Sequence, residues 1–211
     1  MSEFTARQVE TLLKVERGRI RVVPHGVDPA LPSTVRENIV LSTGAIQKRK
    51  NIARLVRAFE RTPRGWTLVL AGASDGFGAA EELRAMEASP RHRDIRVAGY
   101  VSDDELRHLY SRARIFAFPS LDEGFGMPVL DAMASGVPVI TSNRSAMPEV
   151  AGDAALLVDP EDEGAIGDAL VRLIDDEMLR NQLVDKGHAR AAGLTWQRAV
   201  RSTWAVYQEL R

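Results

Sequence analysis

The sequence contains no cysteine. This absence excludes a disulfide framework and any thiolate metal site, and it is compatible with a reducing compartment. No apolar run approaches the ~20 residues of a membrane-spanning helix, and the first residues lack the basic, apolar and small-residue order of a signal peptide. We therefore expect a cytoplasmic protein.

An excess of charge of one sign is also missing. The 28 Lys and Arg residues are matched by 29 Asp and Glu residues, which leaves a formal net charge of -1. A chain with this balance has no general attraction for nucleic acid or for an anionic membrane, so no nucleic-acid partner is expected. The 211 residues, 45% of them hydrophobic, are enough for one large or two small globular domains.

Several familiar catalytic and cofactor motifs are absent too. The four histidines have no metal-ligand spacing. Gly76-Phe-Gly78 and Gly124-Phe-Gly126 begin like a dinucleotide fingerprint, but Glu81 and Val129 stand where its last glycine belongs. There is no Walker loop and no Ser, His and acid grouping for covalent hydrolysis. We therefore expect no metal site and no nicotinamide or other cofactor.

Short apolar runs, most of them unbroken, recur along the chain and predict strands. They cover Ile20–Val23, Ile39–Leu41, Leu68–Ala71, Ile95–Ala98, Ile115–Phe118, Val139–Thr141 and Ala155–Val158. Unbroken runs are typical of strands covered on both faces, and amphipathic stretches such as Ile52 to Phe59 lie between them. Right-handed crossovers wind such a pattern into a doubly wound sheet. The fold prediction is α/β, with a single Rossmann-like doubly wound parallel sheet.

The two ends of the chain are expected to be helical. Beyond Val158 the apolar spacing is that of helices only, and it runs through to Tyr207. Thr5 with Gln8, and Ser102 with Glu105, have the spacing of capping boxes at helix starts. Because no long linker divides the chain, we expect one Rossmann-like domain over residues 20–194, preceded by residues 1–19 and followed by a helix over residues 195–211.

The first candidate site is the run Glu123-Gly-Phe-Gly126, which joins an apolar strand to a helix. Ligands of doubly wound folds collect at the carboxyl ends of strands, and a helix N-terminus attracts phosphate. A carboxylate such as Glu123 accepts hydrogen bonds from sugar hydroxyls, and Asp131, about one turn into the helix, is within reach of a second diol such as a ribose. From spacing alone, a plain strand-to-helix turn with two solvated acids stays open as the alternative.

The second candidate site is the basic run Lys48-Arg49-Lys50-Asn51, which follows the predicted strand Ile39–Leu41. It therefore also lies at the carboxyl end of a strand. Arg and Lys side chains there are suited to neutralising a diphosphate. A solvated loop is the alternative for an isolated charge run, and it stays open on this cluster alone.

Together the two clusters resemble the donor-binding, C-terminal domain of the family 4 retaining glycosyltransferases of the GT-B fold. The resemblance is carried by EGFGMPVLDAMASGVPVITS (123–142) and STGAIQKRKNIARLVRAF (42–59). It extends to VVPHGVD (22–28), LVLAG (68–72), VAGYVSDDEL (97–106) and PEVAGDAALLVDP (148–160). The basic run followed by Asn51 is similar to the mannosyltransferase-like branch, which favours GDP-mannose.

The resemblance implies roles for particular residues. In this family the first acid of an E-x7-E motif contacts the transferred sugar, the glycine-rich turn contacts sugar and phosphate, and the second acid holds the ribose. A basic pair contacts the diphosphate, and the base lies near the backbone after the third strand. The first acid is matched by Glu123 and the second by Asp131. The glycine-rich turn is matched by Gly124, Phe125, Gly126 and Met127. The basic pair is matched by Arg49 and Lys50, and the backbone near the base by Tyr100 and Val101.

The implied activity is retaining transfer of a sugar from a nucleoside diphosphate without a metal, with Glu123, Arg49 and Lys50 at the reacting groups. Two residues depart from the family pattern: Asp131 stands where Glu is usual, and Ala45 where many members carry an additional phosphate-binding Arg.

A GT-B enzyme has two Rossmann-like domains, and this chain matches one. Residues 1–19 are expected to be a remnant of the interdomain helix, so that Met1 begins either an isolated domain or a truncated reading frame. The helix over residues 195–211 is expected to pack back toward the missing N-terminal domain. That domain would hold the unknown acceptor, a glycan or a lipid-linked glycan, and the intact enzyme would lie in the cytoplasm or at the membrane periphery. The alternative is a non-catalytic nucleotide-sugar-binding or assembly module that needs a partner chain or a second copy, and sugar-nucleotide epimerisation is a third hypothesis.

Overall fold

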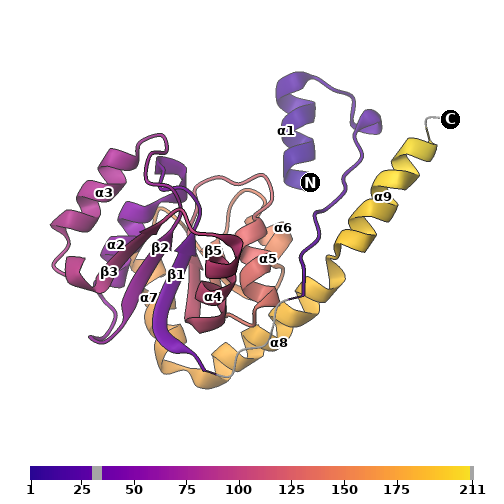
Figure 1. The fold of residues 1–211 in the computed structure, drawn as a ribbon. Coiled ribbons are helices and arrows are strands. Elements are labelled where there is room, and N and C mark those ends of the chain that lie inside the picture. The colour runs from indigo at the N-terminus through magenta and orange to yellow at the C-terminus, as the bar shows by residue number, and fades with distance from the viewer. Residues whose placement is uncertain (30–34, 210–211) are drawn as a thin grey trace.

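The computed structural model describes residues 1–29 and 35–209, and its centre is a parallel sheet (Figure 1). The strands of this part of the chain are β1 (Glu37–Thr43), β2 (Thr67–Ala71), β3 (Ile95–Gly99), β4 (Ala113–Phe118), β5 (Val139–Ser142) and β6 (Ala155–Val158). They form one six-stranded sheet in the order β3-β2-β1-β4-β5-β6, and every neighbouring pair is parallel. The predicted α/β doubly wound fold is therefore confirmed.

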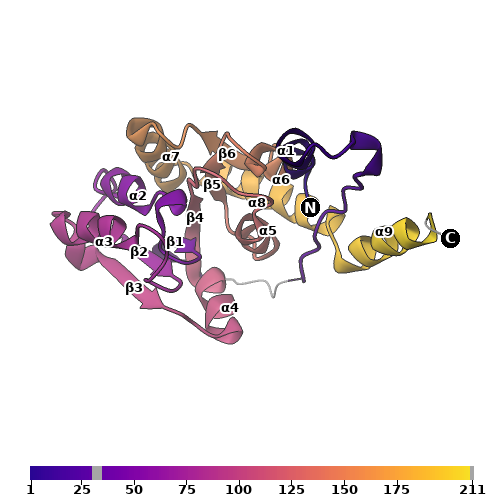
Figure 2. The same cartoon turned by 90° about the horizontal axis from the view of Figure 1, so that it is seen from above.

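Helices cover both faces of the sheet (Figure 2). The helices of the described residues are α1 (Glu3–Leu13), α2 (Ile52–Phe59), α3 (Ala79–Ala88), α4 (Asp103–Arg112), α5 (Met127–Ala134), α6 (Met147–Ala151), α7 (Glu163–Asp175), α8 (Glu177–Gly193) and α9 (Trp196–Gln208), with short 3-10 turns η1 (Arg17–Arg19), η2 (Lys48–Lys50) and η3 (His92–Asp94). Of these, α1 and α9 lie away from the sheet (Figure 1). One apolar cluster lies between the sheet and α4, α5 and α6, and a second between the sheet and α2, α3 and α7. In β1, Leu41 enters the first cluster and Val40 the second, and both are fully buried. Because alternate side chains of a strand point to opposite faces, this two-sided cover explains the unbroken apolar runs.

The predicted strand Ile20–Val23 is wrong. The structure has no strand there, and Val22 and Val23 are only half-buried. Pro24 follows them and has no N–H to donate to a sheet. Arg21 of this segment pairs with Glu209 at 2.8 Å, and Val27 N, a few residues on, donates to Leu194 O at 2.9 Å. The segment thus joins α1 to the body of the protein by contacts with the ends of α8 and α9, not by pairing with the sheet.

Of the two predicted capping boxes, one is confirmed and one is wrong. Ser102 caps α4, with Glu105 N donating to Ser102 Oγ and Ser102 N donating to Glu105 Oε2. In α1 the cap is Ser2, whose Oγ accepts from Thr5 N at 3.0 Å. Thr5 therefore lies inside the first turn of α1, because a serine three residues earlier already satisfies its N–H.

The C-terminal part is helical as predicted, with α7, α8 and α9 following β6. Residues 210–211 of the predicted last helix lie outside the described residues. The division at residues 20, 194 and 195 stays a prediction. No helix in residues 1–29 and 35–209 is both long and apolar enough to span a membrane.

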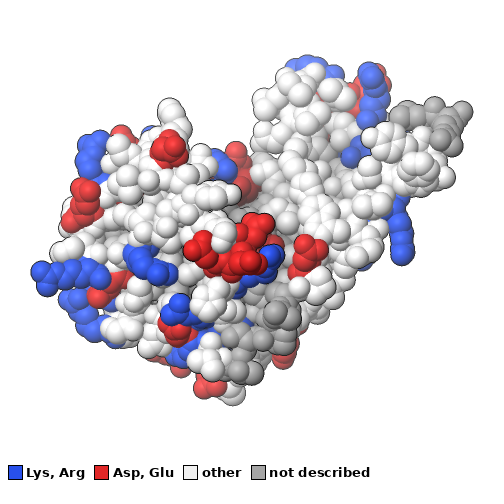
Figure 3. Space-filling model, viewed as in Figure 1, with Lys and Arg blue, Asp and Glu red and all other residues white. Residues whose placement is uncertain are grey.

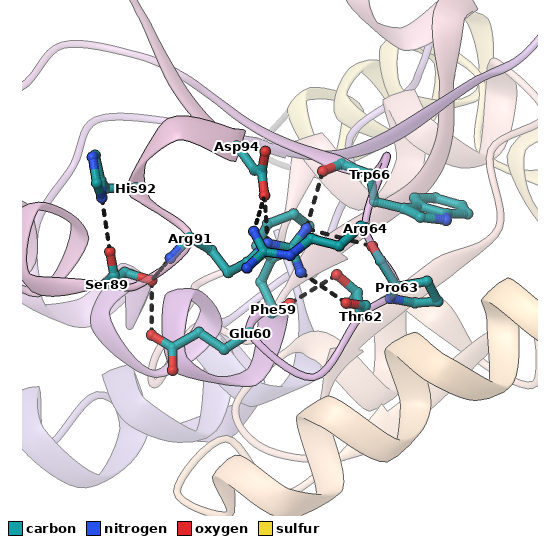
Figure 4. A network of polar contacts seen from close by, with 10 residues as sticks. All are labelled: Phe59, Glu60, Thr62, Pro63, Arg64, Trp66, Ser89, Arg91, His92 and Asp94. Carbon is teal, nitrogen blue, oxygen red and sulfur yellow. Dashed lines mark hydrogen bonds and ion pairs between the residues drawn. The ribbon is translucent and has the colours of Figure 1, made fainter.

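A buried arginine ties together the amino ends of β2 and β3 (Figure 4). Arg91 Nη1 donates to Thr62 O at 2.7 Å, Arg91 Nε pairs with Asp94, and the guanidinium lies 4.9 Å from the centre of the Phe59 ring. These contacts lie at the end of the sheet opposite the loops that leave β1 and β4. We therefore assign them to stability.

Candidate functional site

The order of strands reverses between β1 and β4. The chain moves outward from β1 to β2 and β3 on one side, and from β4 to β5 and β6 on the other. Such a switch point leaves a crevice outside the carboxyl ends of the two strands, where doubly wound folds bind ligands. Both predicted clusters follow these two strands, since η2 comes after β1 and the turn Glu123–Gly126 comes after β4.

The structure brings the three predicted catalytic residues into contact. Lys50 Nζ and Arg49 Nη1 each lie 2.6 Å from Glu123 Oε1, and the Ser120 hydroxyl lies 2.8 Å from the same oxygen. The Lys50 and Glu123 side chains are 8% and 10% exposed, whereas that of Arg49 is 45% exposed. Lys50 Nζ also lies 4.2 Å from the centre of the Phe118 ring. The site is therefore a nearly buried ion pair with a more accessible second cation.

Burial and pairing act in opposite directions on this ion pair. Burial is the largest influence on Lys50 and lowers its pKa, against the raising effect of the Glu123 carboxylate. Burial raises the pKa of Glu123, but the attraction of Lys50 and the hydrogen bonds from Arg49, Lys50 and Ser120 outweigh it, so that this pKa is lowered. Glu123 is thus a carboxylate at neutral pH, held by cations that an anionic ligand would compete for.

Two residues without a predicted role in ligand binding, Asn51 and Leu121, join the loops around this ion pair. Asn51 has a left-handed backbone (φ 60) and its Nδ2 donates to Pro119 O at 3.0 Å and to Pro160 O at 2.6 Å. Leu121 N donates to Arg49 O at 2.7 Å. The loops after β1, β4 and β6 are therefore joined at one edge. Asparagine tolerates a left-handed backbone, so its place directly after the basic run is the sequence signal for this turn, although the sequence did not indicate the two carbonyls that it binds.

The turn Gly124-Phe125-Gly126 is shaped by packing on both sides. Gly126 has φ 105, and a Cβ at this position would lie 2.3 Å from Met147 Cε. The Phe125 side chain is buried, with its ring 5.1 Å from that of His25, which in turn lies 5.9 Å from Trp196. The predicted donor-binding residue Phe125 therefore places its ring in the core, and Gly126 leaves no room for a side chain beside Met147.

Asp131 lies apart from the ion pair. It borders an open cavity of about 520 Å³ that is also lined by Asp28, Tyr110, Met127 and Trp196. Burial, and then repulsion by Asp28, raise the pKa of Asp131 to about 6. The Tyr110 hydroxyl lies 3.0 Å from Thr43 Oγ1, at the end of β1.

The remaining predicted residues follow β3 at the same edge of the sheet. Tyr100 is 87% exposed and Val101 is half-buried, and neither contacts the ion pair. Figure 3 shows acidic side chains gathered near the centre of this face, where the first turn of α4 carries Asp103, Asp104 and Glu105. Over the residues described, no group of three or more His, Cys, Asp or Glu side chains is placed to hold a metal ion.

The sheet order and the charged cluster at its switch point define a Rossmann-like domain. Residues 28–190 match the family described as "Glycosyl transferases group 1". The chain belongs to this family, and the resemblance to the C-terminal domain of GT-B glycosyltransferases is confirmed.

Curated relatives support the same assignment. The chain is 36% identical to O-antigen chain mannosyltransferase B of Escherichia coli over 82% of its own length and 46% of that protein. It is 32% identical to the MMP alpha-(1->4)-mannosyltransferase of Mycolicibacterium hassiacum, over 99% of its length and 53% of that protein. The chain thus spans about half the length of these relatives.

Solved structures show the same fold. The chain superimposes on sucrose-phosphate synthase from Thermosynechococcus elongatus with a TM-score of 0.84 at 26% identity, over 100% of this chain and 57% of that one. For Anabaena Alr3699/HepE, a complex with UDP and glucose, the TM-score is 0.85 at 15% identity, over 99% and 61% of the two chains.

Proposed function

We propose that this chain is the donor-binding part of a retaining glycosyltransferase that uses a nucleoside-diphosphate sugar, with GDP-mannose as the favoured donor. The acceptor would be held by a second, N-terminal domain. The transfer would need no metal or cofactor and would take place in the cytoplasm or at the membrane periphery. The observation that carries this proposal is the contact of Arg49 and Lys50 with Glu123 at the switch point of the sheet.

The preference for mannose rests on the relatives. Both curated proteins described above are named as mannosyltransferases, and the chain is more than 30% identical to each. The guanine base comes from the resemblance of the basic run to the mannosyltransferase-like branch. UDP in the Anabaena structure carries no weight for the donor, because the similarity there is limited to the fold.

The charges of the site suit departure of a diphosphate. As the bond from sugar to phosphate breaks, negative charge grows on the diphosphate, and preorganised cations stabilise it without reorganisation of solvent. A diphosphate with more charge than one carboxylate would draw Arg49 and Lys50 away from Glu123. The freed Glu123 carboxylate would then accept hydrogen bonds from the sugar hydroxyls and stabilise the positive charge of the ring. Asp131 would accept from the ribose hydroxyls, in the cavity that it borders.

The proposal is tested by calorimetric titration of the protein with GDP-mannose and UDP-glucose. Arg49→Ala is the informative variant, because Arg49 is half-exposed and its removal leaves Lys50 paired with Glu123. We expect it to weaken donor binding about tenfold or more, as for the loss of one charge-assisted hydrogen bond. The matched control is Arg57→Ala, which has 44% exposure and pairs with Glu163 of α7. Absence of binding by the parent protein to either donor would refute the proposal.

One observation favours the alternative of a module that needs a partner. The apolar side chains of α9 are strongly exposed: Trp196, Val200, Trp204 and Tyr207 are 40%, 66%, 55% and 61% exposed. They line an open cavity of about 420 Å³ together with Val23, Pro24 and His25. An apolar face of this kind is typical of a docking surface. Under this alternative the chain binds a donor but transfers no sugar until a partner chain or a second copy covers α9.

The alternative has two forms, in which either a second copy or a separate partner chain covers α9. Sedimentation velocity of the parent protein and of Trp204→Asp distinguishes them. A dimer that Trp204→Asp returns to a monomer would support self-association. A parent protein that is monomeric at every concentration would leave only a separate partner chain.

A further inference from the structure

The first turn of α1 is bound to the site turn by two hydroxyl groups. Ser2 Oγ donates to Gly124 O at 2.6 Å, and Thr5 Oγ1 donates to the same oxygen at 2.8 Å. Ser2 is completely buried in this contact. Because a carbonyl oxygen has two lone pairs, the two hydroxyls use its full accepting capacity. The orientation of the Gly124 carbonyl is therefore determined by α1.

A carboxylate on α6 holds the same end of α1 in place. Glu149 Oε1 accepts from Glu3 N at 2.8 Å, and Oε2 accepts from Phe4 N at 3.1 Å. A carboxylate at this position satisfies two of the unpaired N–H groups of the helix and interacts favourably with its dipole. The start of α1 is thus fixed by Glu149 on α6 as well as by its contact with Gly124.

The orientation of the Gly124 carbonyl determines that of the next N–H group. In a planar trans peptide the C=O and the following N–H point in opposite directions. The described residues contain no cis peptide bond, so the Phe125 N–H points away from Ser2 and Thr5. Neither the backbone nor a side chain of the described structure accepts a hydrogen bond from Phe125 N. This N–H therefore has no acceptor within the described part of the protein.

We infer that Ser2 and Thr5 are positioning residues for the donor. Through the Gly124 carbonyl they hold the Gly124–Phe125 peptide so that the Phe125 N–H donates to an oxygen of the diphosphate. The inference rests on the proposed function, because it assumes a nucleoside-diphosphate donor in the crevice. It adds the N-cap and a first-turn residue of α1, which lie 122 and 119 positions from Gly124 in the sequence. Backbone N–H groups held in advance stabilise developing negative charge more than mobile ones do.

The test compares nucleoside diphosphates with nucleosides that lack phosphate. GDP, UDP, guanosine and uridine are titrated into the parent protein and into the double variant Ser2→Ala, Thr5→Val, and the amide resonance of Phe125 is followed by NMR. In the double variant we expect the affinity for the preferred diphosphate to fall about tenfold, which is the effect of losing one hydrogen bond to a charged group. The affinity for the corresponding nucleoside should be unchanged. Thr5→Ser, which keeps the hydroxyl, should bind the diphosphate like the parent.

Ser102→Ala is the matched control for stability. It removes the N-cap of α4, a loss of about 1 kcal/mol, and leaves Gly124 untouched. If the double variant does not fold, the single change Thr5→Val, which conserves the shape of the side chain, takes its place.

The outcomes separate this inference from the proposed function. If the parent protein binds no nucleotide, both are overturned. If the parent binds a diphosphate and the variant binds it equally well, only the positioning role is overturned. A variant that loses affinity for the nucleoside in the same proportion also overturns it, because such a loss indicates general damage to the site.

Discussion

Replacement of Asp131 by asparagine is expected to stabilise the protein while weakening donor binding. The pKa of Asp131 is raised from 3.8 to about 6 by burial and by repulsion from Asp28. A raised pKa means that the folded state binds more protons than the unfolded state between these values, so stability falls as the pH rises through this range. The difference between a pKa of 3.8 and one of about 6 corresponds to about 3 kcal/mol, which we reduce to about 1 to 2 kcal/mol because Asp131 is only half-buried.

The assay is urea unfolding of the parent protein and of Asp131→Asn at two pH values. About pH 4 lies close to the unfolded-state pKa of 3.8, and about pH 7.5 lies above the folded-state pKa of about 6. The amide is neutral at both values, so the variant should be more stable than the parent at the higher pH and nearly equal to it at the lower. Asp28→Asn is the control, since it removes the repulsion but leaves the buried carboxylate, and we expect a smaller gain. The reasoning is refuted if the two proteins differ equally at both pH values, or if Asp131→Asn is no more stable than the parent at the higher one.

Three further predictions concern stability. Gly126→Ala combines a positive φ with a clash against Met147, and we expect it to lower the free energy of unfolding in urea by about 2 to 4 kcal/mol. At Gly124 an added Cβ would meet its neighbours at 3.4 Å, so Gly124→Ala should lower it by less than about 1 kcal/mol. Similar losses for the two variants would contradict this prediction. Arg91→Lys keeps the charge but loses the hydrogen bonds of the guanidinium to backbone carbonyls, and we expect the free energy of unfolding to fall by about 2 kcal/mol or more. A melting temperature equal to that of the parent protein would disprove this prediction. Ser142 Oγ is buried without a hydrogen-bond partner in the described structure, so Ser142→Ala should leave stability unchanged or raise it by up to about 1 kcal/mol; a clear loss in urea unfolding would show that the hydroxyl has a partner.

The strands of the sheet were predictable because burial on both faces produces an unbroken apolar run, which is visible in the local sequence. The run Ile115 to Phe118, for example, contributes Ile115 to one apolar cluster and Phe116 to the other. Ile20–Val23 is also rich in β-branched residues, but it has no strand to pair with. A run of β-branched and apolar residues indicates that a segment is suited to a strand, but the tertiary structure decides whether a neighbouring strand is present to pair with it.

The two halves of the site were predictable separately, and their meeting followed from the topology. Arg49 and Lys50 follow one strand and Glu123 another, and the carboxyl ends of parallel strands lie at the same edge. The hydroxyls of Ser2 and Thr5 were not predictable as contacts of Gly124, because nothing in the local sequence states that a helix so distant along the chain returns to this turn. Thr5 was instead assigned to a capping box, which is a local pattern.

The three neighbouring rings of Phe125, His25 and Trp196 provide an optical probe of the site. Trp196 begins α9, and its ring lies 5.9 Å from that of His25, which contacts the ring of Phe125 in the turn. The sequence contains three tryptophans, of which Trp66 is buried in the core and Trp204 is exposed. With Trp66 and Trp204 replaced by phenylalanine, Trp196 becomes the single tryptophan, and its indole can be excited selectively over the three tyrosines. Its fluorescence then records ligand binding at the turn in stopped-flow experiments, without any label added to the protein.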